Sequence, residues 1–409
     1  MRRTNDLTVI EVSPSLHATT MGQHQTHHWN NLPHHIIVRI LSYLDHRDRH
    51  AAAVTCKRWA ECFANPSLWE LDASFWFYHG QHAGDQLNGF PQYAKHLKSI
   101  TIYFDKKEYL TTNVKNVCKL LTVLSQMESL KLEKFAICAD YRFLYGRNKG
   151  NSLAQARATK CWELMHRFLA NPCLDGGLRE VDFSGLPVAN SNSLVNLLAN
   201  MHSNIHHINL QNDNLSRVVS RQDVVNLVHK CRKLVSLEIL DDWVTPALLT
   251  ALADDDRAPL QHLSLVVRGM RKRATGSGWE HLTRRLPHLK VSVTFISIFP
   301  LQGMPLSWVL SQEIPLVNLN VSLIASDSYI SQSLRFLSST YQGTLEDIAI
   351  LLPPDRHDSL LRFLRHCHKL KVLCCANLNE QVKRTIHELY PSLEIQENPG
   401  LRLDMGPNR

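Results

Sequence analysis

The stretch "LREVDF" at residues 178–183 begins a pattern that returns at residues 205–210 as "IHHINL". Both hexapeptides have apolar residues at the first, fourth and sixth positions. Alternation in the second half of each is typical of a short strand, because neighbouring strand residues point to opposite faces. The segment between them, "SLVNLLANMHSN" at residues 193–204, has the apolar spacing of a helix. The stretch therefore predicts a strand, a helix and a second strand.

The same pattern recurs along most of the chain, with Ile, Val, Met or Phe allowed in place of Leu. Further copies are "LKSITI" at 97, "MESLKL" at 127, "LVSLEI" at 234, "LQHLSL" at 260, a degenerate "LKVSVT" at 289, "LVNLNV" at 316, "LEDIAI" at 345 and "LKVLCC" at 370. Successive copies start 25–30 residues apart, except for one interval of 51. One such unit cannot bury its apolar face alone, so the units must stack. We expect an α/β solenoid with a concave parallel sheet and outer helices.

These units resemble leucine-rich repeats, and "HKCRKLVSLEI" at 229–239 and "RHCHKLKVLCC" at 365–375 are similar to the Cys-containing variety. The usual repeat has Asn or Cys three residues beyond the last strand leucine, where the side chain bonds backbone between coils. That place holds Leu186, Asp213, Asp242 and Arg268 in four units, and Asn212 and Asn214 flank it in one. We therefore expect about ten irregular units over residues 73–395, with an insertion at 138–162 that forms a loop and a short helix.

A different segment precedes the repeats, and we assign it residues 29–72, after a tail at 1–28; a second tail follows at 396–409. Its sequence "LPHHIIVRILSYLDHRDRHAAAVTCKRWAECFANPSLW" fills residues 32–69. Apolar residues at 36, 37, 40, 41 and 44 form a helical stripe, and Pro33 suits a first helical turn. A second helix is expected through "RHAAAVTCKRWAECFAN". On its own this pattern fits a pair of helices that caps the first coil of the solenoid.

The order "LP", "ILSYLD", "RD", "VTCKRW" and "NPSLW" resembles the F-box, a three-helix segment that binds the Skp adaptor of cullin-RING ubiquitin ligases. The resemblance implies that the adaptor-binding residues are Leu32, Pro33, Ile36, Ile37, Ile40, Leu41, Leu44, Trp59 and Trp69. The chain departs from the motif at His34, His35, Arg49, His50 and Thr55. An exposed apolar face of this kind is what a partner-binding surface needs.

The pairing of an F-box with leucine-rich repeats implies a substrate-receptor subunit of an SCF-type ubiquitin ligase, in which the repeats bind a protein substrate. Such a subunit raises the local concentration of the substrate near an enzyme held elsewhere, so this chain is expected not to be an enzyme. The departures from the motif keep a second hypothesis open. In that hypothesis the chain is a leucine-rich-repeat interaction scaffold that acts outside a cullin complex.

The candidate substrate face follows from strand alternation, because the residues between the apolar positions point away from the core. These residues are Arg179, Glu180, Asp182, His206, His207, Asn209, Gln211, Glu238, Gln261 and His262. Their mixed charge suits recognition of a protein or a peptide segment and does not identify one.

Other function classes are disfavoured by composition and motifs. The net charge of +8 is spread along the chain, so no nucleic-acid partner is expected. One local cluster of positive charge is formed by Arg268, Arg271, Lys272 and Arg273. This cluster is a solvated loop, a patch that binds an acidic partner, or a nuclear-import signal. Cys374 and Cys375 are adjacent on a predicted strand, so their side chains should point to opposite faces and cannot both bind one metal ion. No metal and no cofactor are expected. No GxSxG, HExxH, P-loop or GxGxxG motif is present. Apolar runs are too short for a membrane span, which favours a cytoplasmic or nuclear protein.

Overall fold

The computed structural model describes residues 31–44, 46–69, 72–77, 94–104, 112–138, 152–171, 174, 177–186, 193–201, 203–212, 215–268, 276–296, 306–321, 327–352, 356–376 and 378–396 of the chain. The expected tail at 1–28 lies outside these residues, as do 397–409 of the expected C-terminal tail and 139–151 of the expected insertion.

Three short helices and a 3-10 turn form the N-terminal module. They are α1 (His34–Ser42), α2 (His46–Ala53), α3 (Lys57–Phe63) and η2 (Pro66–Leu68). Pro33 immediately precedes α1 with φ of −55°, and the Asn65 side chain accepts a hydrogen bond from the Ser67 N–H at the start of η2. Proline favours the start of a helix because it has no N–H that would be left without an acceptor there. Asparagine favours it because its side-chain oxygen accepts a hydrogen bond from a free backbone N–H.

The rest of the described chain alternates strands with helices. The strands are β1 (Asp72–Phe77), β2 (Ser99–Phe104), β3 (Lys134–Cys138), β4 (Glu180–Asp182), β5 (His207–Asn209), β6 (Ser236–Leu240), β7 (His262–Val267), β8 (Lys290–Phe295), β9 (Leu316–Val321), β10 (Asp347–Leu351), β11 (Val372–Ala376) and β12 (Glu394–Gln396). The helices are α6 (Thr112–Ser125), α7 (Ser152–Leu169), α8 (Ser193–Met201), α9 (Arg221–Lys230), α10 (Pro246–Leu252), α11 (Gly276–Arg285), α12 (Asp327–Thr340), α13 (His357–Leu364) and α14 (Glu380–Leu389), with 3-10 turns η5 (Leu215–Arg217), η6 (Asp241–Trp243) and η7 (Leu306–Trp308).

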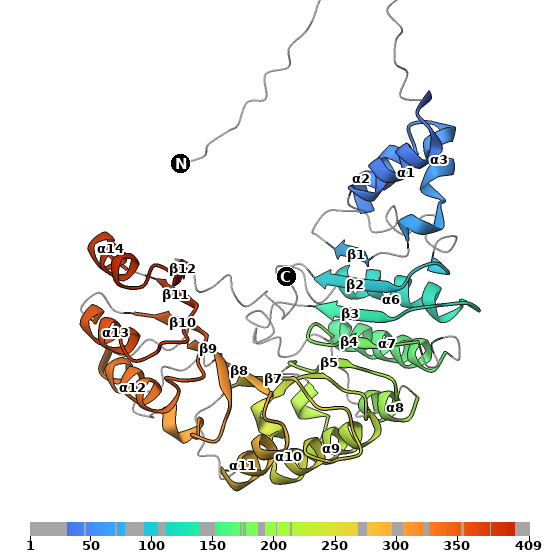
Figure 1. Ribbon diagram of the computed structural model, residues 1–409. Coiled ribbons are helices and arrows are strands. Elements are labelled where there is room, and N and C mark those ends of the chain that lie inside the picture. Colours follow the sequence, from blue (N-terminus) through green and yellow to red (C-terminus); the bar gives the residue numbers. More distant parts are fainter. Residues whose placement is uncertain are drawn as a thin grey trace, which may run out of the picture.

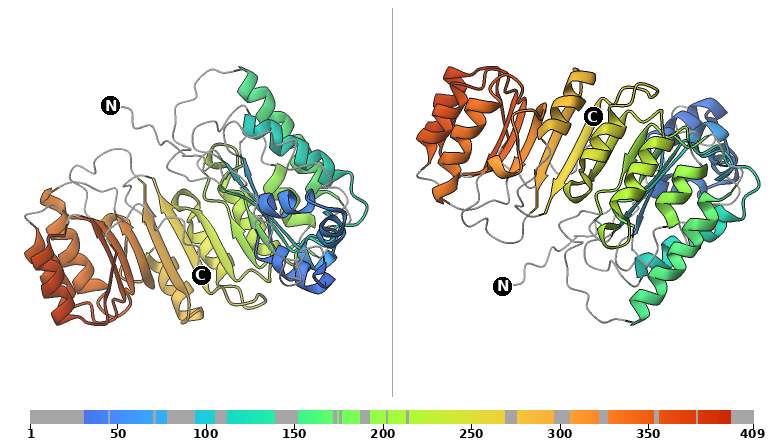
Figure 2. Two further views of the ribbon diagram at one scale, coloured as in Figure 1. Left: turned by 90° about the horizontal axis from the view of Figure 1, so that it is seen from above. Right: turned by 90° about the horizontal axis from the view of Figure 1, so that it is seen from below.

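All twelve strands form one sheet in sequence order, and every neighbouring pair is parallel. The sheet lines the inner side of an arc and the helices cover its outer side (Figure 1). Views from above and below show the same succession of strand–helix layers from the N-terminal module to α14 (Figure 2). The predicted α/β solenoid with a concave parallel sheet is therefore confirmed.

The core lies between the strands and the outer helices. At the centre of the sheet Val181, Ile208, Leu237 and Leu263 stand in register on consecutive strands, and each is at most 3% exposed. Burying one such side chain contributes roughly 1.5–3 kcal/mol. The same apolar cluster continues into the N-terminal module through residues such as Trp69. The module and the solenoid thus share one core.

The structure corrects the position of the second predicted repeat. "MESLKL" at 127–132 lies before the strand, and β3 is formed by Lys134–Cys138, so the repeat reads "LEKFAI" from Leu132. The two apolar patterns overlap in sequence, and pairing of β3 with β2 selects the later one. Leu130 and Leu132 still enter the core from the preceding loop.

The sheet is also longer than the repeat pattern predicted. Residues 72–77, which precede the first copy of the pattern at 97, form β1, and Glu394–Gln396 form β12 after the last copy at 370. Within the insertion the structure contains the beginning of an 18-residue helix, α7, rather than a short one. Neither added strand carries the full repeat pattern, so only pairing with a neighbouring strand identifies it.

Candidate functional site

The N-terminal module has a compact interior of its own. Ile37 and Leu41 from α1 are fully buried, and Trp69 after η2 is 1% exposed. The rings of Phe63 and Trp69 meet edge to face with centroids 5.0 Å apart, and the indole N–H of Trp69 donates to the Phe63 carbonyl oxygen at 2.8 Å. A buried tryptophan is stable when its indole N–H has a hydrogen-bond partner, as it has here. Ile37, Leu41 and Trp69 therefore hold the module together, and their side chains are not on its surface.

Arg49 connects the helices of the module. Its Nε donates to the carbonyl oxygens of Leu41 and Leu44 at 2.9 and 2.8 Å, and its Nη1 donates to the Leu68 carbonyl oxygen at 3.0 Å. The first two carbonyls lie at and just beyond the C-terminal end of α1, where the intrahelical donors run out. A guanidinium supplies the several donors this needs. The departure from the motif at Arg49 thus has a structural role.

Two other features fix the module's ends. The Thr55 hydroxyl donates to the Ala52 carbonyl oxygen at 2.6 Å at the end of α2, and Arg58 Nη2 donates to the Leu32 carbonyl oxygen at 2.6 Å. Thr55, another departure from the motif, therefore closes a helix end. The side chain of His50 lies outside the described residues.

The outer surface of the module is formed by the remaining predicted residues. Pro33, His34 and His35 are exposed. Leu32, Ile36, Ile40, Leu44 and Trp59 are half-buried. These side chains reach the surface while part of each packs inside, which is the condition for a partner-binding residue.

Two apolar side chains on this module are strongly exposed, and neither was among the adaptor-binding residues predicted from the sequence. Tyr43 is 77% exposed at the end of α1, and Val54 is 73% exposed after α2. Neither belongs to the apolar stripe of α1, so periodicity did not find them. The available signal was their position in the "ILSYLD" and "VTCKRW" segments. Exposed apolar side chains grouped on a small module indicate a binding surface.

On the solenoid, strand pairing places the predicted face in two rows across the sheet. Glu180, His207, Ser236, His262 and Lys290 form the first row on β4 to β8. Asp182, Asn209, Glu238, Ser264 and Ser292 form the second. The side chains of both rows point away from the core, because the residues between them are buried in it.

Six of the ten predicted face residues lie in these rows, and four lie elsewhere. Arg179, His206 and Gln261 each precede their strand, at the edge of the sheet, where Arg179 pairs with Glu133 at 3.9 Å. Gln211 follows β5 and is buried, and its Nε2 donates to the Ser264 hydroxyl at 2.9 Å. The structure therefore brings together the residues at strand positions and places the flanking ones on the rim.

The second row carries a desolvated pair of carboxyl groups. Burial, with the Asp182 charge nearby, raises the pKa of Glu238 to about 8, and burial raises the pKa of Asp182 as well. In the first row, burial lowers the pKa values of His207 and His262. The centre of the concave face is thus a poorly hydrated polar surface, where unpaired charge is unfavourable.

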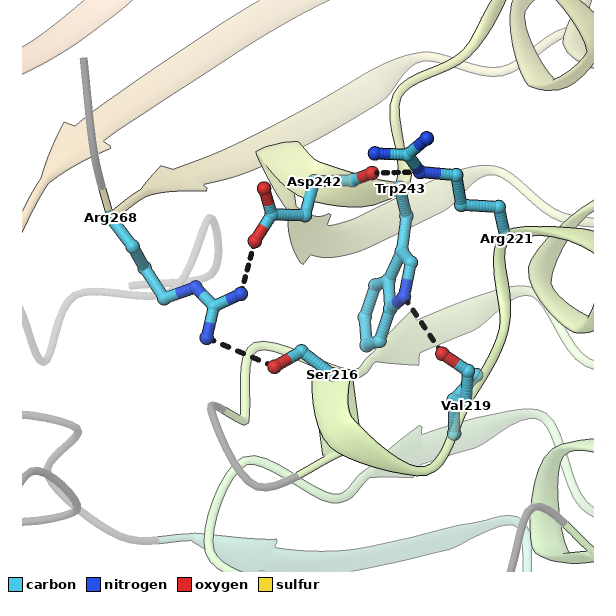
Figure 3. A network of polar contacts seen from close by, with 6 residues as sticks. All are labelled: Ser216, Val219, Arg221, Asp242, Trp243 and Arg268. Carbon is cyan, nitrogen blue, oxygen red and sulfur yellow. Dashed lines mark hydrogen bonds and ion pairs between the residues drawn. The ribbon is translucent and has the colours of Figure 1, made fainter. Parts of the chain in front are cut away.

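A polar network holds the ends of the central strands at the edge of this face (Figure 3). Arg268, after β7, donates through Nη1 to the Ser216 hydroxyl at 2.9 Å and pairs through Nη2 with the Asp242 carboxylate. Arg221 Nε donates to the Asp242 carbonyl oxygen at 2.9 Å, and Trp243 Nε1 donates to that of Val219 at 3.2 Å. The Arg268 guanidinium therefore serves the fold, whereas Arg271, Lys272 and Arg273 lie outside the described residues.

The described part of the chain brings no three His, Cys, Asp or Glu side chains together in a way that could hold a metal ion. Cys374 and Cys375 are both buried and occupy opposite faces of β11. None of the described helices is long and apolar enough to cross a membrane.

Three helices with an exposed apolar surface, followed by a parallel strand–helix solenoid, resemble the arrangement of F-box proteins with leucine-rich repeats. Residues 29–70 match the F-box-like family. The chain is 25% identical over 275 residues to F-box/LRR-repeat protein 21 of Bos taurus, covering 63% of this chain and 58% of the relative. It is 24% identical over 327 residues to F-box/LRR-repeat protein 8 of Homo sapiens, covering 77% and 79%. The resemblance to F-box proteins with leucine-rich repeats is thereby confirmed.

Solved structures have similar overall arrangements at low sequence identity. A chain from the crystal structure of the yeast Rad7 and Elc1 complex aligns with a TM-score of 0.45 and 13% identity, covering 88% of this chain and 92% of that chain. The leucine-rich repeat-containing protein LegL7 from Legionella pneumophila aligns with a TM-score of 0.38 and 11% identity, covering 74% and 93%.

Proposed function

We propose that this protein is the substrate-recognition subunit of an SCF-type ubiquitin ligase. In this proposal the F-box binds the Skp adaptor, and through it a cullin-RING complex, while the solenoid binds a protein substrate. The observation that carries the proposal is the exposed apolar surface of the F-box domain. Tyr43 and Val54 contribute nothing to the folded core, so a partner is the simplest reason for leaving them in water.

The structure of the F-box supports this role in a second way. Arg49 and Thr55 are two of the four departures that kept the scaffold hypothesis open, with His34 and His35, and these two bond to helix ends inside the module. The module therefore keeps its three-helix form with these residues in place. The surface residues among the proposed adaptor contacts are Leu32, Pro33, Ile36, Ile40, Leu44 and Trp59, to which we add Tyr43 and Val54.

Catalysis in this proposal belongs to other subunits. A receptor accelerates ubiquitin transfer by holding the substrate close to the conjugating enzyme, so its own residues need to bind and orient only. The concave face, with its rows of polar side chains on a rigid sheet, suits such binding. Its extent over many strands fits a protein partner better than a small molecule.

Co-purification tests the proposal. The full-length chain is expected to capture purified Skp adaptor, and Leu32→Ala combined with Pro33→Ala is expected to weaken capture strongly. An exposed substitution on α9, Asn226→Ala, serves as the matched control. Failure of the unaltered chain to capture the adaptor, or equal capture by the double variant, would favour the scaffold hypothesis.

A further inference from the structure

The centre of the concave face contains a carboxyl group, that of Glu238, for which the described residues supply no hydrogen-bond or ion-pair partner. Asp182, Asn209 and Glu238 stand side by side on β4, β5 and β6, and Ser264 follows on β7. Neighbouring strands lie about 4.8 Å apart, so the backbones that carry Asp182 and Glu238 are roughly 10 Å apart with Asn209 between them. The two carboxyl groups are close enough for the charge of Asp182 to act on Glu238.

Asn209 bonds toward Asp182 and the backbone, and as a neutral amide it cannot neutralise Glu238. Its Nδ2 donates to Asp182 Oδ2 at 3.0 Å, and its Oδ1 accepts from the Gln211 N–H at 2.9 Å. Asp182 also accepts from the Ser184 N–H at 2.7 Å. This chain of bonds orients Asp182 and holds Asn209 away from its other neighbour, Glu238.

Two polar side chains on β6 remain without partners within the part of the chain that the structure describes. The Glu238 carboxylate makes no hydrogen bond or ion pair there, and neither does the Ser236 hydroxyl, although Ser236 is only 4% exposed. Both lie on the concave side of β6, two residues apart. Glu238 is half-buried, so both groups are largely withdrawn from water. A polar group in such a place without a protein partner is unfavourable, and it suits a ligand or an ordered water.

The neighbouring cations are committed elsewhere. Lys134 pairs with Glu180 at 3.4 Å, and Lys290 lies 3.8 Å from Glu346. Burial lowers the pKa values of His207 and His262, so these imidazoles are neutral near pH 7 and do not repel a cation. Among the described residues, no positive charge pairs with either Asp182 or Glu238.

We propose that Glu238, with Asp182 and Ser236 beside it, forms a subsite that binds a lysine or arginine side chain of the protein held by the solenoid. This inference rests on the proposed function and names the chemistry of the substrate segment. The cation supplies the counter-charge that Asp182 lacks among the described residues and that Glu238 lacks once its proton is lost, and the N–H groups of the cation donate to Glu238 and Ser236. Charge-assisted bonds of this kind are strongest where water is excluded.

The subsite predicts that binding depends on pH. Glu238 is protonated below pH 8 and must lose its proton to pair with a cation, so affinity rises as pH increases from 6.5 to 8.5. The groups that face it are Asp182 on β4, Asn209 and His207 on β5, and Ser264 and His262 on β7, with Gln211 and Cys138 nearby. His207 and His262 also lose any residual positive charge as pH rises. They then repel a bound cation less, which adds to the rise in affinity.

A random dodecamer library displayed on phage is the probe, with the full-length chain as the target at pH 8. We expect selected peptides to share a lysine or arginine whose replacement by norleucine or citrulline weakens binding at least tenfold. Glu238→Gln should remove that preference while retaining the side-chain shape. Glu180→Gln is the matched control, because Glu180 faces the same side but is already paired with Lys134.

Two results would overturn the subsite: selected peptides without a common cation, or equal losses in the Glu238 and Glu180 variants. Thermal unfolding of each variant shows that it is folded before selection. Capture of the Skp adaptor by the same preparations separates this inference from the proposed function. A chain that captures the adaptor but selects no cation contradicts the subsite alone, and the converse contradicts the ligase role alone.

Discussion

Arg49 shows how one side chain can decide whether a small module folds. Its guanidinium donates to four backbone carbonyl oxygens, those of Leu41, Ser42, Leu44 and Leu68, at and just beyond the end of α1 and in η2. Replacement by methionine keeps the aliphatic stem but removes all four of these bonds. We expect Arg49→Met to destabilise the module by about 2–4 kcal/mol. Hydrogen exchange of α1 and α3 amides measures this loss.

The control for this prediction is Arg39→Met, because Arg39 is an exposed arginine on α1. That substitution should leave exchange in the module unchanged. Equal protection in the Arg49 and Arg39 variants would show that the bonds of Arg49 contribute little. Lysine at position 49 should rescue only part of the loss, since one ammonium cannot reproduce the planar fork of donors.

Glu238 provides a second prediction at this scale, on stability alone. Its pKa is about 8 in the folded chain, above the ordinary carboxyl value of 4.5, so the folded state holds the proton more tightly than the unfolded state. The free energy of unfolding must therefore fall as pH rises from about 4.5 to 8. Glu238→Gln removes this contribution, so the variant should match the parent near pH 4.5 and exceed it by ~1–3 kcal/mol at pH 8.

Denaturant unfolding at pH 4.5, 6 and 8 checks this sign. Glu180→Gln serves as the control, because the ion pair with Lys134 gives it a different environment on the same face. A constant difference between Glu238→Gln and the parent across these pH values would mean that Glu238 is well hydrated in the folded chain.

The Asn212 side chain bonds the backbone between neighbouring coils. In the usual leucine-rich repeat this role belongs to the next position, which is 213 in this chain. The side-chain amide of Asn212, fully buried, donates to the carbonyl oxygens of Phe183 and Leu186 at 2.9 and 2.8 Å. Alanine there removes both bonds, and the Phe183 carbonyl oxygen then keeps only the bond from the Leu186 N–H. We expect Asn212→Ala to destabilise the β4–β5 junction by about 2–3 kcal/mol, measured as faster hydrogen exchange of those strands.

Asn226→Ala on the exposed face of α9 should leave exchange at this junction unchanged. Because solenoid units contact mainly their neighbours, the effect of Asn212→Ala should also fade with distance along the array. Uniform loss of protection in all strands would instead indicate a single cooperative unit.

Strand positions were predictable where the apolar pattern was unambiguous. β4 to β7 formed at the expected places, because the fourth and sixth residues of each repeat enter the core. β3 was misplaced by the overlap of "MESLKL" and "LEKFAI", which only pairing with β2 resolves. β1 and β12 carry incomplete patterns, so their place in the sheet depends on contacts with β2 and β11 rather than on local sequence.

The candidate sites were predictable to a smaller extent. Alternation correctly placed Asp182, Asn209 and Glu238 on one face, since it depends on backbone geometry alone. It did not show that Glu238 lacks a partner, which depends on side chains from three strands. In the F-box, the apolar stripe mixed buried Ile37 and Leu41 with surface residues, because a helical stripe does not distinguish its own core from a partner.

For the whole molecule, the shared core makes the F-box both the proposed adaptor surface and the first layer of the solenoid. α2 contacts β1, and buried residues continue from Ile37 to Leu393 in one cluster. A bound adaptor would therefore be held at a fixed orientation to the concave face. That fixed geometry is what a substrate receptor needs to place its substrate near a distant enzyme.

The affinity of the purified Skp adaptor for the full-length chain, measured by calorimetry, tests the central claim most directly. Tyr43→Ser with Val54→Ser should weaken binding by at least about tenfold, because exposed aromatic and aliphatic anchors dominate such interfaces. Leu389→Ser is the control, since Leu389 on α14 is 54% exposed at the opposite end of the solenoid. Adaptor binding that is lost only in the Tyr43/Val54 variant supports the receptor role. No binding by the parent chain, or equal affinity in all three proteins, contradicts it.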